Sequence, residues 1–135
     1  MRVLLRREGF TLIELLIVIV IIGILAMIAT SLFWNVKDRG LQASMQSDLK
    51  SAATQQELYF AANNSYAPAT ADLLEFTPSP GVVLTINYGM PDGWAGVVTH
   101  LSLATAQCGL AINNAPLASA SPATIPGVIS CTGLD

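Results

Sequence analysis

The sequence predicts an α+β fold, in which one long N-terminal α-helix packs on a small antiparallel β-sheet of about three to four strands. The chain has no proline before Pro68, and its first half is rich in helix-forming residues. After residue 81, short runs of β-branched and aromatic residues alternate with turn residues instead. These two patterns divide the chain into a helical half and a sheet-forming half.

The first part of the helix, residues 10–33, is long and apolar enough to cross a membrane. No side chain from Leu15 to Ala29 is charged. A helix of about 20 residues is roughly 30 Å long, which matches the hydrocarbon core of a bilayer. Three arginines precede it, so the positive-inside rule predicts a cytoplasmic N-terminus and an exported C-terminal part. These arginines are Arg2, Arg6 and Arg7.

Glu14 is the one charged residue near the start of this apolar helix. A carboxylate inside a bilayer helix costs about 2.5–3.5 kcal/mol on insertion scales. The residue is therefore expected to have a specific partner, although a side chain near a helix end can also reach the headgroups.

The N-terminal motif resembles that of a known family. The chain reads GFTLIELLIVIVIIGILA from Gly9 to Ala26, which closely resembles the N-terminus of type IV pilins and of the related pseudopilins of type II secretion. An ordinary secretory signal would instead carry its small-residue cleavage site after the apolar run, where residues 26–29 offer only a weak match. The resemblance implies that residues 1–9 are a leader removed by a prepilin peptidase, which cuts after Gly9 and methylates Phe10. It also implies that Glu14 neutralises the N-terminal amine of a neighbouring subunit and so sets the register of assembly.

The same resemblance implies a filament subunit with a pilin-like lollipop fold. The implied function is a structural, major subunit of a type IV pilus that polymerises with copies of itself and serves adhesion or twitching motility. The implied partners are the prepilin peptidase, an inner-membrane platform and separate assembly and retraction ATPases. The chain would lie in the inner membrane before assembly and in an extracellular pilus afterwards, with no cofactor and no enzymatic activity.

The helix is expected to continue over residues 34–62. Apolar residues recur there at steps of three, four and seven, with more polar faces between them. The apolar positions are Leu41, Met45, Leu49, Ala52 and Tyr59, and the polar ones are Asp38, Gln42, Asp48, Lys50 and Gln55. Gly23 and Gly40 are points of expected helix flexibility. Many pilins carry a proline after the residue matching Gly23, but Thr30-Ser31-Leu32 stands there, so the helix is expected to remain unbroken.

Residues 63–81 are expected to form a connecting loop, with one helical turn near residues 72–76. Residues 82–135 should form the sheet, with strands at 82–88, 94–103, 109–113 and 128–131 and a turn at 89–93. Alternation along the second strand assigns His100 to its polar face, where a solvated or hydrogen-bonded histidine is expected.

The two cysteines, Cys108 and Cys131, both lie in the part predicted to be exported. Exported compartments are oxidising, so a disulfide is expected, and in the chain-entropy model it would stabilise the domain by about 3 kcal/mol. Cysteines near the C-terminus also resemble the disulfide-bounded region of many type IV pilins. A metal site is a poorer alternative, because the sequence has no second cysteine pair and only one histidine.

The charge pattern narrows the possible functions. Without the leader only Lys37, Arg39 and Lys50 are basic, so no direct nucleic-acid binding is expected. After Asp92 the only charged side chain is Asp135. Calcium needs six to eight oxygen ligands, and major pseudopilins typically hold that ion with acidic groups in a C-terminal loop. A pilus subunit is therefore favoured, with a pseudopilin or a single-span anchored domain as alternatives. Catalysis is disfavoured by the single histidine and the lack of a GxSxG motif.

Overall fold

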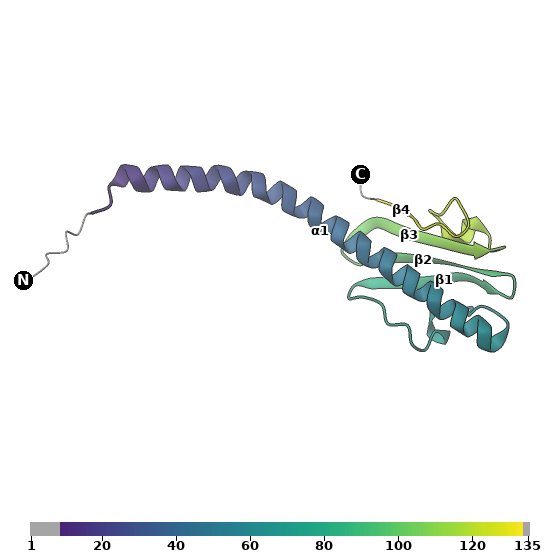
Figure 1. Cartoon of the computed structure of the whole chain (residues 1–135). Helices are drawn as coiled ribbons and strands as arrows, with labels where there is room; N and C mark the ends of the chain where they lie inside the picture. The colour runs from purple at the N-terminus through teal and green to yellow at the C-terminus, as the bar shows by residue number, and fades with distance from the viewer. Residues whose placement is uncertain (1–8, 134–135) are drawn as a thin grey trace, which may run out of the picture. The chain divides into compact units, whose positions relative to one another are not determined.

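The computed structural model describes residues 9–133, so the predicted leader, apart from Gly9, lies outside the described residues. One long helix, α1 (Leu12–Asn63), is followed by a four-stranded antiparallel sheet, which confirms the α+β fold (Figure 1). The strands are β1 (Val82–Met90), β2 (Gly93–His100), β3 (Leu103–Asn113) and β4 (Ser130–Thr132). Two short 3₁₀ helices, η1 (Thr70–Asp72) and η2 (Leu117–Ala120), lie in the connections.

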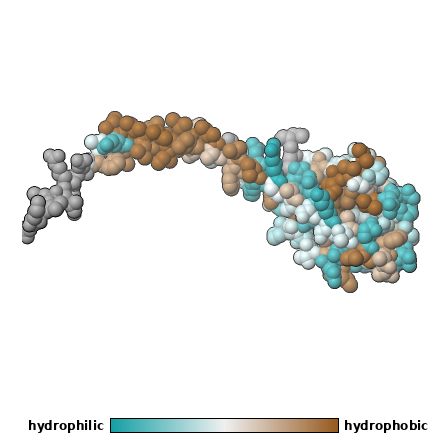
Figure 2. All heavy atoms as spheres, in the orientation of Figure 1, coloured by the Kyte–Doolittle hydropathy of each residue, from teal (hydrophilic) through white to brown (hydrophobic). Residues whose placement is uncertain are grey.

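The chain divides into two compact units, of which the first ends at Val36 and the second begins at Lys37. The first unit holds the apolar part of α1, whose surface is almost continuously hydrophobic (Figure 2). Each large apolar side chain from Leu12 to Val36 is between 44% and 88% exposed. This stretch therefore buries none of its large apolar side chains within the chain itself, and α1 is long and apolar enough to cross a membrane.

The second unit has a true hydrophobic core between α1 and one face of the sheet (Figure 1). Met45, Leu49 and Ala52 are fully buried there against Trp94 and Val98 of β2. These three residues confirm the apolar face predicted from helical periodicity. Leu41 and Tyr59, at the ends of the predicted face, are half-buried.

The prediction that Asp48 belongs to a more polar face is wrong. Asp48 is only 7% exposed, because its position three residues after Met45 places it on the buried face. The carboxylate is satisfied there by Ser79, whose N–H donates at 2.7 Å and whose hydroxyl donates at 2.9 Å. A hydrogen-bonded loop residue thus makes a carboxylate acceptable on a core face.

The end of α1 follows from a left-handed residue. Asn64 has φ of 53° and donates its N–H to the carbonyl of Phe60 at 2.8 Å. Asparagine is one of the few non-glycine residues that adopts this conformation readily, and here it closes the last turn. The helix therefore ends at Asn63, within a residue of the predicted end.

The sheet is a simple antiparallel meander in the order β1-β2-β3-β4. Met90 pairs with Gly93, so Pro91 and Asp92 alone form the first turn, which is tighter than predicted. The second turn corrects a larger error, since the chain reverses at residues 101–102 and Leu103 begins β3 rather than ending β2. The apolar alternation continues through Leu101 and Leu103, so the sequence pattern predicted one long strand where the structure has a turn.

His100 is hydrogen-bonded, as expected, but the face of β2 on which it lies is buried rather than polar. It is 6% exposed, and alternation places it on the same face of β2 as the buried Val98. Its Nδ1 accepts the N–H of Ser102 at 3.0 Å, and the N–H of Leu101 donates to the carbonyl of Gly81 at 2.9 Å. These bonds fix a reversal at Leu101 and Ser102, where the alternation of β2 continues in the sequence, and this explains why the turn was not predicted.

The opposite face of the sheet is covered by a second cluster made of alanines. Ala95 and Ala111 of the sheet pack against three alanines from the segment between β3 and β4, namely Ala115, Ala120 and Ala123. A Cβ on Gly109 would collide with the carbonyl oxygen of Ala120, so the covering segment depends on a residue without a side chain. The third and fourth strands, predicted at 109–113 and 128–131, run over Leu103–Asn113 and Ser130–Thr132.

Candidate functional site

The start of α1 is closed by a reciprocal pair of hydrogen bonds between Thr11 and Glu14. The hydroxyl oxygen of Thr11 accepts the backbone N–H of Glu14 at 3.2 Å. The carboxylate Oε2 of Glu14 accepts the backbone N–H of Thr11 at 2.9 Å and its hydroxyl at 2.7 Å. This arrangement is a capping box, which satisfies two N–H groups that the first turn of a helix leaves without partners.

The capping box changes the interpretation of Glu14, which the sequence presented as an anion without a partner inside the chain. In the structure Oε2 is occupied by Thr11, whereas no described residue donates a hydrogen bond to Oε1. The carboxylate can therefore cap its own helix and still accept one further donor. Sequence reasoning overlooked Thr11, although the pattern T-x-x-E before an apolar run was the available signal.

Gly9 and Phe10 both lie ahead of the helix. Neither belongs to a regular element, and α1 begins two residues after Phe10. The Phe10 side chain is 80% exposed, and a Cβ built on Gly9 would meet no described atom within 4 Å. The bond between these two residues is thus non-helical and uncrowded.

Gly23 and Gly40 lie inside α1, and the helix runs through both without interruption. A Cβ added at either position would meet nothing within 4 Å. Close packing inside the chain therefore does not explain why either position is glycine. Their predicted role as flexible points stays a prediction.

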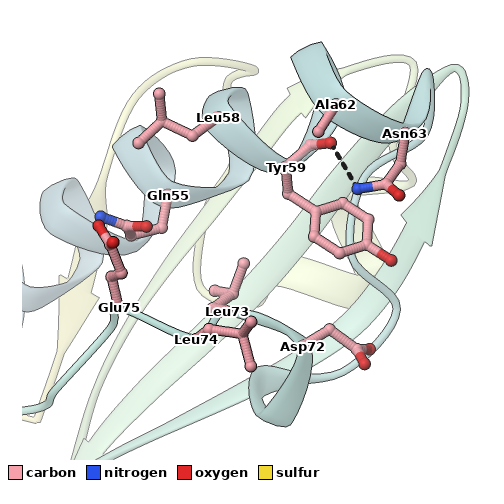
Figure 3. Close-up of a pocket in the computed structure, with 9 residues that line it drawn as sticks. All are labelled: Gln55, Leu58, Tyr59, Ala62, Asn63, Asp72, Leu73, Leu74 and Glu75. Carbon is pink, nitrogen blue, oxygen red and sulfur yellow. Dashed lines mark hydrogen bonds between the residues drawn. The ribbon is translucent and has the colours of Figure 1, made fainter.

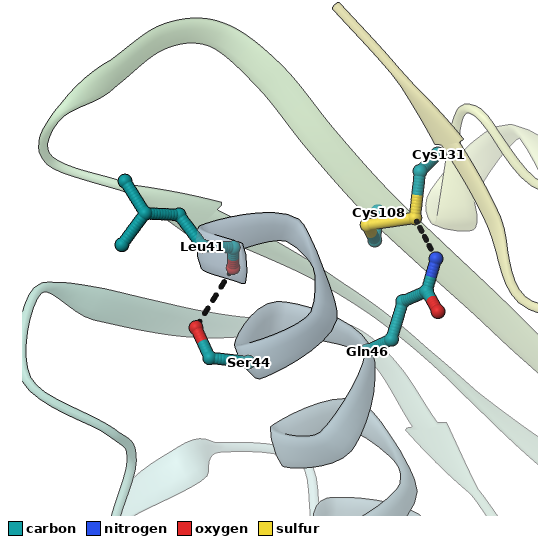
Figure 4. The surroundings of a disulfide bond; sticks show 5 residues. All are labelled: Leu41, Ser44, Gln46, Cys108 and Cys131. Carbon is teal, nitrogen blue, oxygen red and sulfur yellow. Dashed lines mark hydrogen bonds between the residues drawn. A yellow bond between two sulfur atoms is a disulfide. The ribbon is translucent and has the colours of Figure 1, made fainter. Parts of the chain in front are cut away.

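Cys108 and Cys131 form the predicted disulfide (Figure 4). They stand opposite each other in the register of β3 and β4, with Cα atoms 4.1 Å apart. The side chain of Gln46 on α1 donates from Nε2 to the sulfur of Cys131 at 3.3 Å. The disulfide therefore ties β4, a strand of only three residues, to β3, and the Gln46 hydrogen bond ties it to α1.

Gln56 fixes the connecting loop to the helix. Its amide oxygen accepts the N–H of Ala67 at 2.8 Å, and its Nε2 donates to the carbonyl of the same residue at 3.1 Å. Both residues are fully buried. Like Asp48, Gln56 was not recognised from sequence, because a polar residue in a helical pattern indicates an exposed face unless its loop partner is known.

Tyr66 joins three separate parts of the second unit. Its hydroxyl donates to Glu57 at 3.1 Å and accepts from Asn113 at 3.0 Å, while its ring stacks on Phe60. Burial raises the pKa of Tyr66, the Glu57 carboxylate raises it further, and the Asn113 bond partly opposes both. The ring thus remains neutral and packs as a core residue.

A shallow groove lies between the last turns of α1 and the segment that follows η1 (Figure 3). Its floor is apolar, with Tyr59 and Leu73, and its rim carries Asp72 and Glu75. Among the described residues that line it there is no histidine, cysteine, serine or lysine.

Comparison with known proteins identifies the family. The model described as the prokaryotic N-terminal methylation motif matches residues 4–30. The chain is 34% identical over 129 residues to the type IV wide pilus major component PilA4 of Thermus thermophilus, covering 88% of this chain and 97% of that protein. The chain belongs to the type IV pilin family. Type IV pilins are structural proteins, membrane-anchored before they assemble into surface pili, and this pilin has the apolar helix such anchoring requires.

Two further relatives of this pilin match over a smaller part of their own length. The type IV major pilin protein PilA of Myxococcus xanthus is 41% identical over 76 residues, which are 56% of this chain but only 34% of that protein. The type II secretion system core protein G of Klebsiella michiganensis is 30% identical over 88 residues, covering 65% of this chain and 62% of that protein. The family and its methylation motif point to processing by a prepilin peptidase and to self-polymerisation.

Proposed function

We propose that this pilin is the major subunit of a type IV pilus, cut between Gly9 and Phe10 and polymerised through α1. The observation that carries the proposal is the exposed apolar surface of α1 from Leu12 to Val36. A continuous apolar surface of this size is not stable in water. It requires either a bilayer or the same surface of neighbouring copies.

Glu14 is proposed to guide the exchange between these two environments. Cleavage after Gly9 creates an amine at Phe10, which is costly in apolar surroundings unless it meets a carboxylate. Among the described residues none donates a hydrogen bond to Oε1 of Glu14, which supports this pairing, because a neighbour's amine can bind there without opening the helix cap. When Glu14 caps its own helix and also binds the amine of a neighbouring subunit, the two subunits would be held at one axial register.

The proposed function also includes an orientation in the membrane and a set of assembly partners. Arg2, Arg6 and Arg7 would keep the leader on the cytoplasmic side, where the prepilin peptidase acts, and the second unit would be exported. An inner-membrane platform and separate assembly and retraction ATPases would move the subunits. Adhesion and twitching motility are the uses proposed for the filament.

A second candidate is a pseudopilin subunit of a type II secretion system, which the similarity to core protein G favours. Two observations favour the pilus: the match to a wide-pilus component covers 97% of that protein, and the sequence carries no charged side chain between Asp92 and Asp135. A single-span anchored domain is a third possibility, and filament formation distinguishes it from both.

The testing experiment is mass spectrometry of filaments sheared from cells that express the chain. We expect the dominant N-terminal peptide to begin with a methylated Phe10 and the cysteines to be joined. An uncut N-terminus confined to the membrane fraction, with no filament, would contradict both pilus and pseudopilin functions. Cleaved protein that never reaches the sheared fraction would favour the pseudopilin.

A further inference from the structure

We propose that Thr11 is a positioning residue for leader removal, because its capping box with Glu14 holds the Gly9–Phe10 bond outside the helix. This inference rests on the proposed cleavage after Gly9. It assigns a role before assembly to a residue pair whose carboxylate is otherwise expected to act in the filament.

A protease binds the peptide bond that it cuts in a non-helical form. In a helix, each peptide C=O and N–H is engaged in the i to i−4 ladder, so a helical bond must be unwound before it enters an active site. Gly9 and Phe10 are free of this ladder, and α1 begins at Leu12. The scissile bond is therefore already in a form that a peptidase can bind.

The capping box of Thr11 and Glu14 prevents α1 from extending upstream. Arg6, Arg7 and Glu8, just upstream, are good helix formers, and an apolar environment favours every additional intrahelical bond. Extending α1 upstream would first require the N–H of Glu14 to bond to the carbonyl of Phe10, but the Thr11 hydroxyl already accepts that N–H. A longer extension would also need the N–H of Thr11, which Oε2 of Glu14 accepts at 2.9 Å.

The capping box requires a hydroxyl at position 11 and an acceptor oxygen on the side chain at position 14. A threonine hydroxyl can accept the Glu14 N–H and donate to the carboxylate, as it does here at 2.7 Å. Valine has the same shape without the oxygen, whereas serine keeps the oxygen. Glutamine in place of Glu14 keeps a carbonyl acceptor without the charge, and capping boxes use glutamine as well as glutamate.

The test measures initial rates of leader removal from the full-length precursor in membranes that contain the prepilin peptidase. We expect Thr11→Val to be cut about fivefold more slowly, the effect of losing a typical helix cap. Thr11→Ser and Glu14→Gln should be cut at close to the wild-type rate. A Thr11→Val precursor cut as fast as wild type would overturn this inference alone, whereas an uncut wild-type chain would overturn the proposed function with it.

A rescue variant separates helix positioning from direct contact between Thr11 and the peptidase. Proline is favourable at the first helical position and disfavours helix in the residue before it. Adding Leu12→Pro to Thr11→Val should therefore restore the rate, while Leu12→Pro alone should leave it unchanged. A double variant as slow as Thr11→Val would mean that the hydroxyl acts by contact, against the proposal.

A structural readout that does not depend on cleavage completes the test. Cα chemical shifts of Gly9 and Phe10 in the full precursor, in micelles, report whether the two residues are helical. We expect non-helical shifts in the wild type and a movement toward helical values in Thr11→Val. Identical shifts in both proteins would contradict the proposal.

Discussion

At the scale of single residues, three polar side chains on buried or apolar surfaces have defined partners. Glu14 bonds to Thr11, Asp48 to Ser79 and Gln56 to Ala67. In each case the partner is a backbone group or a nearby hydroxyl. The hydrogen bond therefore satisfies the polar side chain and also fixes the path of the partner's backbone. These residues determine where the helix begins and how the following loop is held.

Glu14→Gln should separate processing from assembly. The amide keeps the cap on Thr11 but cannot neutralise a neighbour's amine, and removing one partner of a buried ion pair costs about 3–5 kcal/mol. We expect normal leader removal and at least a hundredfold less sheared filament, measured by immunoblot. Glu75→Gln, at an exposed position, is the control. Filaments in normal amount from Glu14→Gln would refute the pairing.

Gln56→Leu should destabilise the second unit. Leucine preserves the volume but leaves the buried N–H and C=O of Ala67 without their partner, at a cost of about 3 kcal/mol. Urea unfolding of the pilin in detergent, followed by tryptophan fluorescence, measures the loss. The neighbouring Gln55→Leu should change the free energy of unfolding by less than about 0.5 kcal/mol. Equal effects of the two variants would contradict the stabilising role of the hydrogen bonds between Gln56 and Ala67.

At the scale of elements, prediction succeeded where one pattern dominates and failed where a distant partner decides. The apolar run and the face at Met45, Leu49 and Ala52 gave the helix, and the β-branched runs gave the hairpin. The turn at residues 101–102 was missed because the apolar alternation continues across it and because part of its support is a bond from Leu101 to the distant carbonyl of Gly81. Propensity alone does not report such long-range bonds.

The disulfide should matter more than the length of β4 suggests. Replacing Cys108 and Cys131 by alanine should cost about 3 kcal/mol, because a 23-residue separation is no longer closed in the unfolded chain. For a domain of this size we expect Tm to fall by more than about 10 °C. Calorimetry of the variant and of reduced wild type should give similar losses. An unchanged Tm in both would contradict this.

The continuity of α1 gives a prediction for the filament. The helix passes through Gly23 without interruption, and the sequence places no proline between Gly23 and Leu32. We therefore expect the same hydrogen-bond ladder in the polymer, because no amide is missing and no ring clashes with the preceding turn. A cryo-electron microscopy reconstruction should show a helix across this stretch. A melted segment there would refute the expectation.

At the scale of the whole molecule, the two units have opposite relations to solvent. The second unit has its own core and a disulfide, whereas the first exposes its apolar side chains. Stability of the chain as a whole is therefore a property of its surroundings, whether bilayer or neighbouring copies. Charge and hydropathy alone predict a membrane-length apolar helix from the sequence, because this feature depends on composition rather than on particular contacts.

The distribution of charge also predicts indifference to calcium. Between Asp92 and Asp135 the sequence has no carboxylate side chain, and calcium sites require several oxygen ligands, usually including carboxylates. Adding millimolar calcium to the pilin should shift Tm by less than about 1 °C, because a ligand that does not bind the native state does not stabilise it. Magnesium at equal concentration is the control for ionic strength. A calcium-specific increase in Tm would support the pseudopilin instead.

The alanine-packed segment over the outer face of the sheet has a consequence for the medium in which such a fibre could work. From residue 114 to residue 129 the chain carries no ionisable side chain. At physiological ionic strength mobile ions largely screen interactions between exposed charges that are more than about 8 Å apart, but they have no such effect on dispersion forces or neutral hydrogen bonds. Contacts made by this covering would therefore hold equally in fresh and in saline water.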